Sequence, residues 1–439
     1  MDTDCGGFMG EKTMGALLDD PQIASLAEIA LKNLFRVQLR LGFADPPELV
    51  PFGTADSSVV DTAAHRALAK EAADQSLVLL KNDQKTLPFT APASPKDMVV
   101  GVIGRNANAK GNMQGNYYGT APFLVSPNEG IKAYASTYDS DGSDVDAALK
   151  IVKQVDAVVL VVGLTSEGSR PADEAEGHDR TSLLMPLNQD QLVTKVAAAA
   201  AAAGKPVTVV VMSGGPVDVS AAKSDPNVGA ILWCGYPGQS GGTAIADAIF
   251  GKTNPSAKLT MTWYPESLSK EVAITDMGMR PNTTSGNPGR SHRFYTGTPV
   301  FAFGEGLSYT SFDTRIVRAP SAISSSAFGS DLRLSPLSSK TAATFTVEVT
   351  NKGERDGTEV ILLFASPPNA GHDGMPLQSL ISFDRVAVRP GQKRQVELSV
   401  QASHFTAASR DGSRVVPTGE WKIWVGPRGA DAVVSVQLE

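Results

Sequence analysis

The sequence predicts an α/β sandwich, in which helices cover both faces of a mainly parallel sheet, followed by an all-β sandwich. Two observations lead to this prediction. Between residues 98 and 263, short apolar runs alternate with helical stretches. After residue 341, apolar and polar residues alternate within runs that are separated by turn sequences. At 439 residues, of which 42% are hydrophobic, the chain is long enough for two or three domains with sizeable cores.

Residues 1–57 are not expected to form a domain of their own. The opening MDTDCGGF is typical of a strand end and its loop, and residues 22–41 place apolar side chains at helical spacing. One strand and one helix cannot enclose a core. The segment is therefore expected either to dock on the next domain or, as we favour, to be the remnant of a larger α/β domain outside the sequence. Its last part, 42–57, is rich in Pro, Gly and Asp and predicts a linker.

Residues 58–265 are expected to form the α/β sandwich. A helix is predicted from residue 61 to residue 80, and continuous apolar runs, typical of strands buried on both faces, follow it. The predicted strands are 98–103, 157–162, 207–212, 229–233 and 259–263, and the predicted helices between them are 144–154, 189–203 and 242–250. Gly- and Pro-rich turns follow three of the strands, and they indicate either the edge of a shared cleft or only tight turns.

Residues 266–340 are expected to be a connection with a Ser-rich part at 321–339, and residues 341–439 a small antiparallel sandwich. Its predicted strands are 344–350, 360–364, 395–400 and 420–425. Trp421 and Trp424 are three residues apart on one strand, so they lie on opposite faces and at most one belongs to the core.

Composition excludes several classes of function. The formal charge of −7 comes with no basic stripe, which argues against a nucleic-acid partner. The alanine run 197–203 is shorter than the roughly 20 residues of a membrane span, and no signal peptide is visible. No nucleotide-binding glycine motif and no second histidine at metal-ligand spacing occurs, so neither cofactor nor metal is expected. Cys5 and Cys234 allow one bridge or two free thiols.

The stretch 171–186, PADEAEGHDRTSLLMP, is the strongest candidate for chemistry. It leaves the carboxyl end of a predicted parallel strand, where open α/β sheets usually place their sites. Glu174 and Glu176 are the carboxylates, and Arg180 is expected to pair with Asp179 and anchor the loop. A carboxyl group in a partly dry cleft can donate a proton near neutral pH. The alternative is a solvated acidic turn.

Seven further motifs follow one another in order. They are GNYYG (115–119), EAEGHDR (174–180), SGGPVD (213–218), ILWCGYPGQ (231–239), MTWYP (261–265), GRSHRFY (289–295) and FGEGLSY (303–309). With MDTDCGGF and the stretch ADQSLVLLKNDQKTLP that ends at Pro88, they cover nearly the whole chain. In these motifs the chain resembles the carboxyl-terminal half of glycoside hydrolase family 3, most closely its plant-type β-xylosidase and α-arabinofuranosidase branch.

The resemblance implies a three-domain retaining enzyme. A TIM-type barrel carries an aspartate nucleophile, an α/β sandwich contributes the acid/base glutamate, and a fibronectin III-like domain follows. Nearly all of the barrel is expected to be missing here, and Asp2 and Asp4 do not replace its nucleophile. The acid/base role carries over to Glu174, which lies five residues before Asp179, and Glu176 is the runner-up.

Two hypotheses follow from the resemblance. The first is a fragment or truncated form of an exo-acting glycosidase that releases terminal xylose or arabinose from xylan-type polysaccharides and is inactive by itself. The second is a non-catalytic module that binds glycan or protein. The partner is then an oligosaccharide or polysaccharide, with no nucleic acid and no membrane. Members of the family are usually secreted. The sequence leaves open the compartment, the choice among xylose, arabinose and glucose, the oligomeric state, and whether Met1 is the true start.

Overall fold

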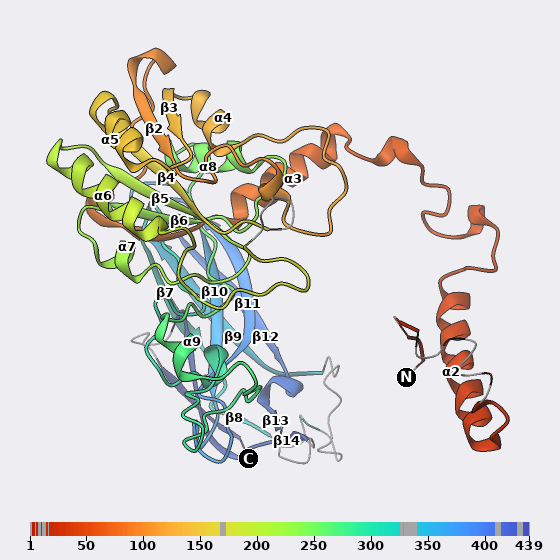
Figure 1. Cartoon of the computed structure of the whole chain (residues 1–439). Coiled ribbons are helices and arrows are strands. Elements are labelled where there is room, and N and C mark those ends of the chain that lie inside the picture. Colours follow the sequence, from red (N-terminus) through yellow and green to blue (C-terminus); the bar gives the residue numbers. More distant parts are fainter. Residues whose placement is uncertain are drawn as a thin grey trace. The chain divides into compact units, whose positions relative to one another are not determined.

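A computed structural model describes residues 2–4, 6–7, 10, 15, 17–166, 173–324, 328, 340–408, 414–427 and 433–438. The chain divides into two compact units, Met1–Ala67 and Leu68–Glu439 (Figure 1). No helix among the described residues is both long enough and apolar enough to cross a membrane. Cys234 is a buried free thiol, whereas Cys5 lies outside the described residues.

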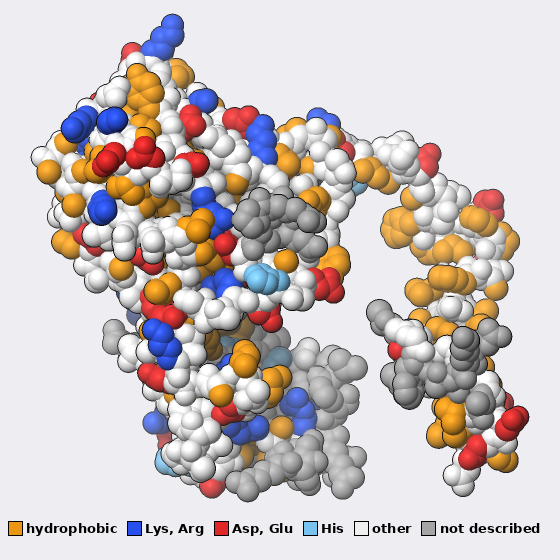
Figure 2. Space-filling view, viewed as in Figure 1, with side chains coloured by type: hydrophobic (Ala, Val, Ile, Leu, Met, Phe, Trp, Pro, Cys, Tyr) orange, Lys and Arg blue, Asp and Glu red, His pale blue; other side chains and the backbone are white. Residues whose placement is uncertain are grey.

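The main element of the first unit is helix α2 (Pro21–Arg40), which is followed by the short 3-10 helices η1 (Pro47–Leu49) and η2 (Ser57–Val59). Asp20 caps α2 by accepting a hydrogen bond of 2.8 Å from the Gln22 backbone N–H. All residues of α2 are described and none is buried. Leu26 and Phe35 are 66% and 52% exposed, and hydrophobic side chains cover much of the surface of this helix (Figure 2). The helix predicted at 22–41 is therefore present, but within its unit its apolar face has no core to fill.

The second unit begins with a six-stranded sheet in the order β1-β6-β5-β4-β2-β3. Its strands are β1 (Val78–Asn82), β2 (Val99–Ile103), β3 (Ser136–Ser140), β4 (Ala157–Gly163), β5 (Val207–Met212) and β6 (Ala230–Trp233). All neighbouring strands are parallel except β1, which runs antiparallel to β6. Every residue of β4 and β5 is buried, as expected for strands covered on both faces.

Helices cover both faces of this sheet (Figure 1). They are α3 (Ala63–Ser76), α4 (Pro127–Lys132), α5 (Val145–Gln154), α6 (Gln189–Ala202), α7 (Ser220–Ser224) and α8 (Gly241–Ile249). In β4, Val158 and Leu160 belong to a core that includes residues of α5 and α6, whereas Val159 and Val161 belong to a core that includes residues of α8. The predicted α/β sandwich is confirmed.

Two predicted elements of this part are wrong. The helix predicted from 61 to 80 ends at Ser76, and the next residues form the antiparallel edge strand β1. Residues 259–263 are not a strand of the sheet, because Leu259 and Trp263 bond instead to the backbone of Glu305 and Phe301. In both cases the apolar residues fit the predicted element as well as the actual one. The pairing with distant segments decides which of the two forms.

After the sheet come the short helices α9 (Ser267–Glu271) and α10 (Ser291–Phe294) and then the β-sandwich. One sheet has the order β11-β10-β15-β16-β8, a second has the order β12-β9-β7, and β13 pairs with β14. The strands are β7 (Phe312–Arg318), β8 (Ala322–Ile323), β9 (Thr341–Asn351), β10 (Gly357–Ser366), β11 (Ser379–Val388), β12 (Lys393–Gln401), β13 (Ala407–Ala408), β14 (Arg414–Val415), β15 (Gly419–Val425) and β16 (Val434–Leu438). Most of the Ser-rich stretch lies outside the described residues.

The two tryptophans of β15 lie on opposite faces, as predicted. Trp421 belongs to the sandwich core and contacts Phe405, with ring centroids 5.3 Å apart. Trp424 stacks on Phe364 at 6.0 Å in a separate apolar cluster, which Phe303 joins from the connection. The outer face of this sheet is thereby buried against the preceding segment.

Candidate active site

The acidic stretch 171–186 follows β4, and Asp173 is its first described residue. Its side chain and backbone are both held by hydrogen bonds. The Asp173 carboxylate accepts a hydrogen bond of 2.8 Å from the Thr165 backbone N–H and pairs with the Arg105 guanidinium at 2.7 Å. In return, the Asp173 backbone N–H donates to the Thr165 carbonyl at 3.0 Å. Arg105 follows β2 and Thr165 follows β4, so the carboxyl ends of two neighbouring strands position the residue that precedes Glu174.

Each carboxylate oxygen of Glu174 has one partner. The Tyr236 hydroxyl donates to Oε1 at 2.7 Å, and Arg180 Nε lies 3.3 Å from Oε2. The other two guanidinium nitrogens of Arg180 donate to the carbonyls of Ser182 and Pro216, at 3.3 and 3.2 Å. The side chain of Glu174 is 26% exposed and that of Arg180 is 17% exposed. The carboxylate is therefore oriented from two sides but remains open to solvent.

Arg180 was expected to pair with Asp179, and the structure corrects this. The chain reverses between Ala175 and His178, whose backbone groups exchange two hydrogen bonds of 3.0 Å. This turn brings position 180 back beside position 174. Among the ion pairs of the described residues, Arg180 takes part in the one with Glu174 and in none with Asp179.

Three glycine-rich turns come together around Tyr236, which contacts Glu174. Tyr236 comes from the turn after β6, Gly214 from the turn after β5, and Gly115 from the turn after β2. A Cβ atom at Gly214 would lie 2.8 Å from Tyr236 Cε2 and 3.2 Å from Glu174 Oε1. At Gly115, where φ is +70°, it would lie 3.2 Å from Tyr236 Cδ2. These two glycines allow the backbone to approach the tyrosine ring closely, so close packing explains them, and the shared cleft stays a prediction.

Tyr236 acts as a hydrogen-bond donor here. Burial raises the pKa of its phenol well above the usual range, and the hydrogen bond to Glu174 acts in the same direction. The phenol therefore keeps its proton at all ordinary pH values. Sequence reasoning did not single out Tyr236, although the Gly-Tyr-Pro-Gly motif after a strand is a signal that could have found it.

Glu176 has different surroundings. Its carboxylate accepts a hydrogen bond from the Tyr117 hydroxyl, and Tyr117 is 82% exposed. His178 is also exposed. The structure thus brings Glu174 together with Arg180 and Tyr236 but places Glu176 and His178 at the surface of the loop.

A buried network of hydrogen bonds joins two of the segments next to the site. Asn112 Oδ1 accepts a hydrogen bond of 2.6 Å from the Ser166 backbone N–H, and Asn112 Nδ2 donates to the Leu164 carbonyl at 2.8 Å. The same amide group donates to Asn106 Oδ1 at 3.0 Å. Asn106 and Asn112 lie in the turn after β2, so this network joins that turn to the end of β4. Within the described ranges, no group of three His, Cys, Asp or Glu side chains is placed to hold a metal ion.

Residues 77–309 match the model of the glycosyl hydrolase family 3 C-terminal domain. The chain belongs to glycoside hydrolase family 3. Residues 359–428 match the fibronectin type III-like domain that the family resemblance implied. These matches confirm the family and the fold class that the sequence motifs predicted.

The relatives from this family are similar along the whole chain. Beta-D-xylosidase 1 of Arabidopsis thaliana is 40% identical over 466 residues, which cover 100% of this chain and 58% of the relative. Beta-xylosidase/alpha-L-arabinofuranosidase 1 of Medicago sativa subsp. varia is 37% identical, with 97% of this chain and 56% of the relative covered. The chain therefore spans little more than half the length of these relatives.

A solved structure supports the same assignment. The GH3 exo-beta-xylosidase XlnD, in complex with a xylobiose aziridine activity-based probe, is 32% identical with a TM-score of 0.86. The match covers 100% of this chain and 57% of that one. Beta-D-glucoside glucohydrolase from Trichoderma reesei, 23% identical with a TM-score of 0.69, shares the fold.

Proposed function

We propose that this chain supplies the α/β and fibronectin III-like parts of an exo-acting glycoside hydrolase that releases terminal xylose or arabinose from xylan-type polysaccharides. Its similarity to plant β-xylosidases supports the substrate class. In this proposal Glu174 is the acid/base residue. The observation that carries the assignment is the pair of contacts, to Tyr236 at 2.7 Å and to Arg180 at 3.3 Å, that orients this carboxylate where three strand-end turns meet.

The proposed chemistry needs two carboxylates. In a retaining glycosidase they stand about 5–5.5 Å apart; one attacks the anomeric carbon, and the other protonates the leaving oxygen and then activates water. Glu174 would perform the second role, with Tyr236 holding Oε1 in place. The nucleophile would come from the part of the relatives that this chain does not match. Glu176 is the less favoured candidate, because its contact is to an exposed tyrosine on a surface loop.

We also propose that residues 1–57 belong to the barrel of such an enzyme. The exposed apolar face of α2 supports this, because a 20-residue amphipathic helix is stabilised mainly by packing its apolar face on a partner. The remaining proposed domains are the α/β sandwich at 58–265, the connection at 266–340 and the fibronectin III-like domain at 341–439.

Complementation tests the proposal. The purified 439-residue chain, given 4-nitrophenyl β-D-xyloside, should show no turnover above background, because the proposed nucleophile belongs to the part of the relatives that this chain does not match. Joined to the barrel segment of the Arabidopsis relative, it should become active. Glu174→Gln should then remove most of the activity, whereas Glu354→Gln, at an exposed glutamate of the sandwich, should leave it unchanged. Turnover by the chain alone would contradict the proposal.

A further inference from the structure

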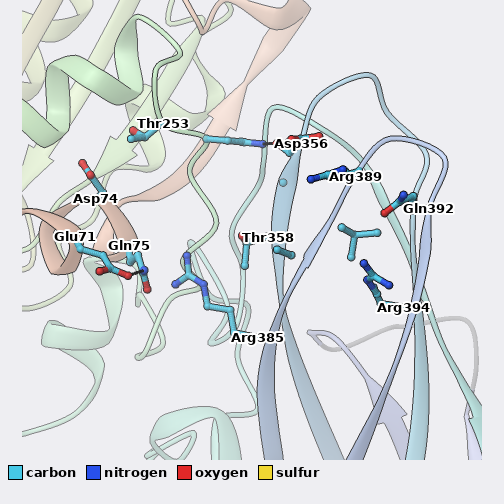
Figure 3. Close-up of a pocket in the computed structure, with 14 residues that line it drawn as sticks. Glu71, Asp74, Gln75, Thr253, Asp356, Thr358, Arg385, Arg389, Gln392 and Arg394 are labelled. Carbon is cyan, nitrogen blue, oxygen red and sulfur yellow. Dashed lines mark hydrogen bonds between the residues drawn. The ribbon is translucent and has the colours of Figure 1, made fainter. Parts of the chain in front are cut away.

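A cavity of about 680 Å³ lies within the second unit, between the α/β sandwich and the β-sandwich (Figure 3). This volume is in the range of about 300–1,000 Å³ that is typical of small-molecule sites. Bonds between the two parts frame it: Asn254 Nδ2 donates to the Asp356 carbonyl at 3.1 Å, and Arg385 Nη2 donates to Ser256 Oγ at 2.7 Å. None of its lining residues belongs to the Glu174 cluster.

The β-sandwich side of the cavity carries hydrogen-bond donors. Arg389 and Gln392 lie in the turn between β11 and β12, and Arg394 follows on β12, so that all three line the same side (Figure 3). Arg394 is two residues before Val396 on β12, on the face of the strand that contributes Leu398 to the sandwich core. The side chain of Arg394 therefore lies on the same face of β12 as the core residue Leu398, but beyond the end of the core.

Arg385, on the same side, already donates to Ser256, but Arg389, Gln392 and Arg394 are not used in this way by the described part of the chain. Among the described residues, no ion pair or side-chain hydrogen bond engages the guanidinium of Arg389 or Arg394 or the amide of Gln392. By contrast, Lys393, on the other face of β12, contacts Glu348 at 3.2 Å. An arginine fork binds a carboxylate through two parallel hydrogen bonds, so two free forks beside a free amide form a suitable site for one carboxylate.

The opposite side of the cavity carries acceptors. Glu71, Asp74 and Gln75 come from α3 (Figure 3). Gln75 Nε2 donates to Glu71 Oε1 at 2.6 Å, and Asp74 pairs with Lys70 at 2.5 Å. The carboxylates of Glu71 and Asp74 on this side, together with that of Asp356 on the β-sandwich side, repel a multiply charged anion such as phosphate. Carboxylates do not donate to the carbonyls of a peptide. Sugar hydroxyls, by contrast, can donate to these carboxylates.

The apolar side chains of the lining are aliphatic. Ala387 and Val388 are the hydrophobic residues among the described ones that line the cavity, and no aromatic ring is among them. A sugar ring therefore has no aromatic ring on which to stack here, and charge and hydrogen bonds supply the specific contacts. The matching ligand has one carboxylate and several hydroxyls.

We propose that this cavity binds an oligosaccharide that carries a single uronic acid, with the carboxylate on Arg389 and Arg394 and hydroxyls toward Glu71 and Gln75. The inference goes beyond the proposed function, because such binding requires neither Glu174 nor a nucleophile. Under the proposed function, the site would hold an acidic branch of the polysaccharide apart from the bond that is cleaved.

Titration calorimetry on the full 439-residue chain tests this directly. The probe is xylotriose that bears one glucuronic acid, and the matched neutral ligand is xylotetraose. We expect saturable binding of the acidic probe, weakened by added salt, and at least about tenfold weaker binding of the neutral one, because a charge-assisted bidentate contact is lost. Equal affinity for both ligands, or no binding of the acidic probe, would overturn the proposal.

Variants locate the site. Arg389→Gln and Arg394→Gln should each weaken the acidic probe by about tenfold or more. Lys393→Gln removes the same charge from the neighbouring position on the other face of β12, and it should leave affinity unchanged. An unchanged urea midpoint shows that each variant is folded. Equal affinity in the arginine variants and the lysine variant would overturn the proposal, as would binding of inorganic phosphate or an acidic peptide as tight as that of the sugar.

Discussion

Glu174 and Glu176 are two residues apart in the same loop, yet their carboxylates have different hydrogen-bond and ion-pair partners. Glu174 is held by a half-buried phenol and a guanidinium, whereas Glu176 contacts a tyrosine that is 82% exposed. The two residues also differ in place, because Glu176 lies in the turn between Ala175 and His178, whereas Glu174 precedes this turn. Only one of the two can be aimed at a glycosidic oxygen, and the contacts favour Glu174.

Gly214 provides a prediction about how tightly the site is packed. A Cβ atom there would lie 2.8 Å from Tyr236 Cε2, closer than side chains can pack. Gly214→Ala should therefore lower the free energy of unfolding by about 1–3 kcal/mol, as overpacking does, measured by urea denaturation. Gly119→Ala is the matched control, because a Cβ at Gly119 meets nothing within 4 Å. Equal stability of the two variants would show that Tyr236 is not confined as described.

Asp190 provides a prediction about pH. Burial, and next the nearby Asp218 carboxylate, raise its pKa from 3.8 to about 6. Because the pKa is raised in the folded state, the contribution of this group to stability is present below the unfolded value and is lost as pH rises through about 6. Asp190→Asn should thus gain stability relative to the native chain between about pH 5 and about pH 7.5, by about 1 kcal/mol after solvent screening is allowed for.

Urea denaturation at the two pH values measures this gain. Asp146→Asn, at an exposed aspartate in the first turn of α5, is the control and should show no comparable change. A constant difference between Asp190→Asn and the native chain across this range would show that the carboxylate is not buried as described.

How much of the site could be predicted differs from residue to residue. The loop and its two glutamates are visible in the sequence, because a polar cluster after an apolar strand is a local pattern. Tyr236 lies 62 positions from Glu174, and its contact depends on the order of strands in the sheet. The pairing of Arg180 was predicted wrongly because the turn at Ala175–His178, which brings it back to Glu174, leaves only a weak local signal at Gly177.

Among the elements, α3 and α8 are joined by a buried charge. The side chain of Asp247 on α8 is 2% exposed; it pairs with Lys70 on α3 at 2.8 Å and accepts from the Tyr134 hydroxyl at 2.5 Å. Asp247→Ala leaves the Tyr134 hydroxyl without its acceptor and leaves Lys70 with Asp74 as its carboxylate partner, which typically costs about 1–3 kcal/mol. We expect a loss of this size in urea denaturation at neutral pH.

The same group fixes the pH dependence of that loss. Burial opposes the effect, but hydrogen bonds from Lys70 and Tyr134 hold the pKa of Asp247 below its ordinary value. Its contribution is therefore present above the unfolded value of 3.8 and is lost as pH falls through the lower folded value. The difference between Asp247→Ala and the native chain should shrink in acid. A variant as stable as the native chain at neutral pH would contradict this account of the α3–α8 contact.

The elements that the sequence predicted correctly are those whose apolar pattern is visible within the segment itself. Strands β2, β4, β5 and β6 and helices α5, α6 and α8 lie within about two residues of the expected ranges. The missed strand β3, STYDS, is mostly exposed or half-buried at the sheet edge, so it has no apolar run to mark it. For β1 and residues 259–263, identical apolar spacing allowed two structures, and pairing across the sheet decided between them.

At the scale of the whole molecule, side chains of the two sandwiches of the second unit contact each other directly. Lys258 pairs with Glu359 at 3.4 Å, and Arg385 donates to Ser256, so polar contacts join the α/β part to strands β10 and β11. The Arg385 contact also borders the cavity between the two parts. Under the inference from this cavity, the β-sandwich would contribute residues to sugar binding.

We propose Glu174, and not Glu176, as the acid/base residue. In the chain joined to the barrel segment of the Arabidopsis relative, kcat/KM is measured for xylobiose, with its poor leaving group, and for 2,4-dinitrophenyl xyloside, whose leaving group needs no proton. Glu174→Ala should slow xylobiose by about 100-fold or more and the activated substrate far less, and azide should partly restore its rate. Glu176→Ala should affect both substrates equally and not respond to azide. Leaving-group dependence with azide rescue in Glu176→Ala would contradict the assignment.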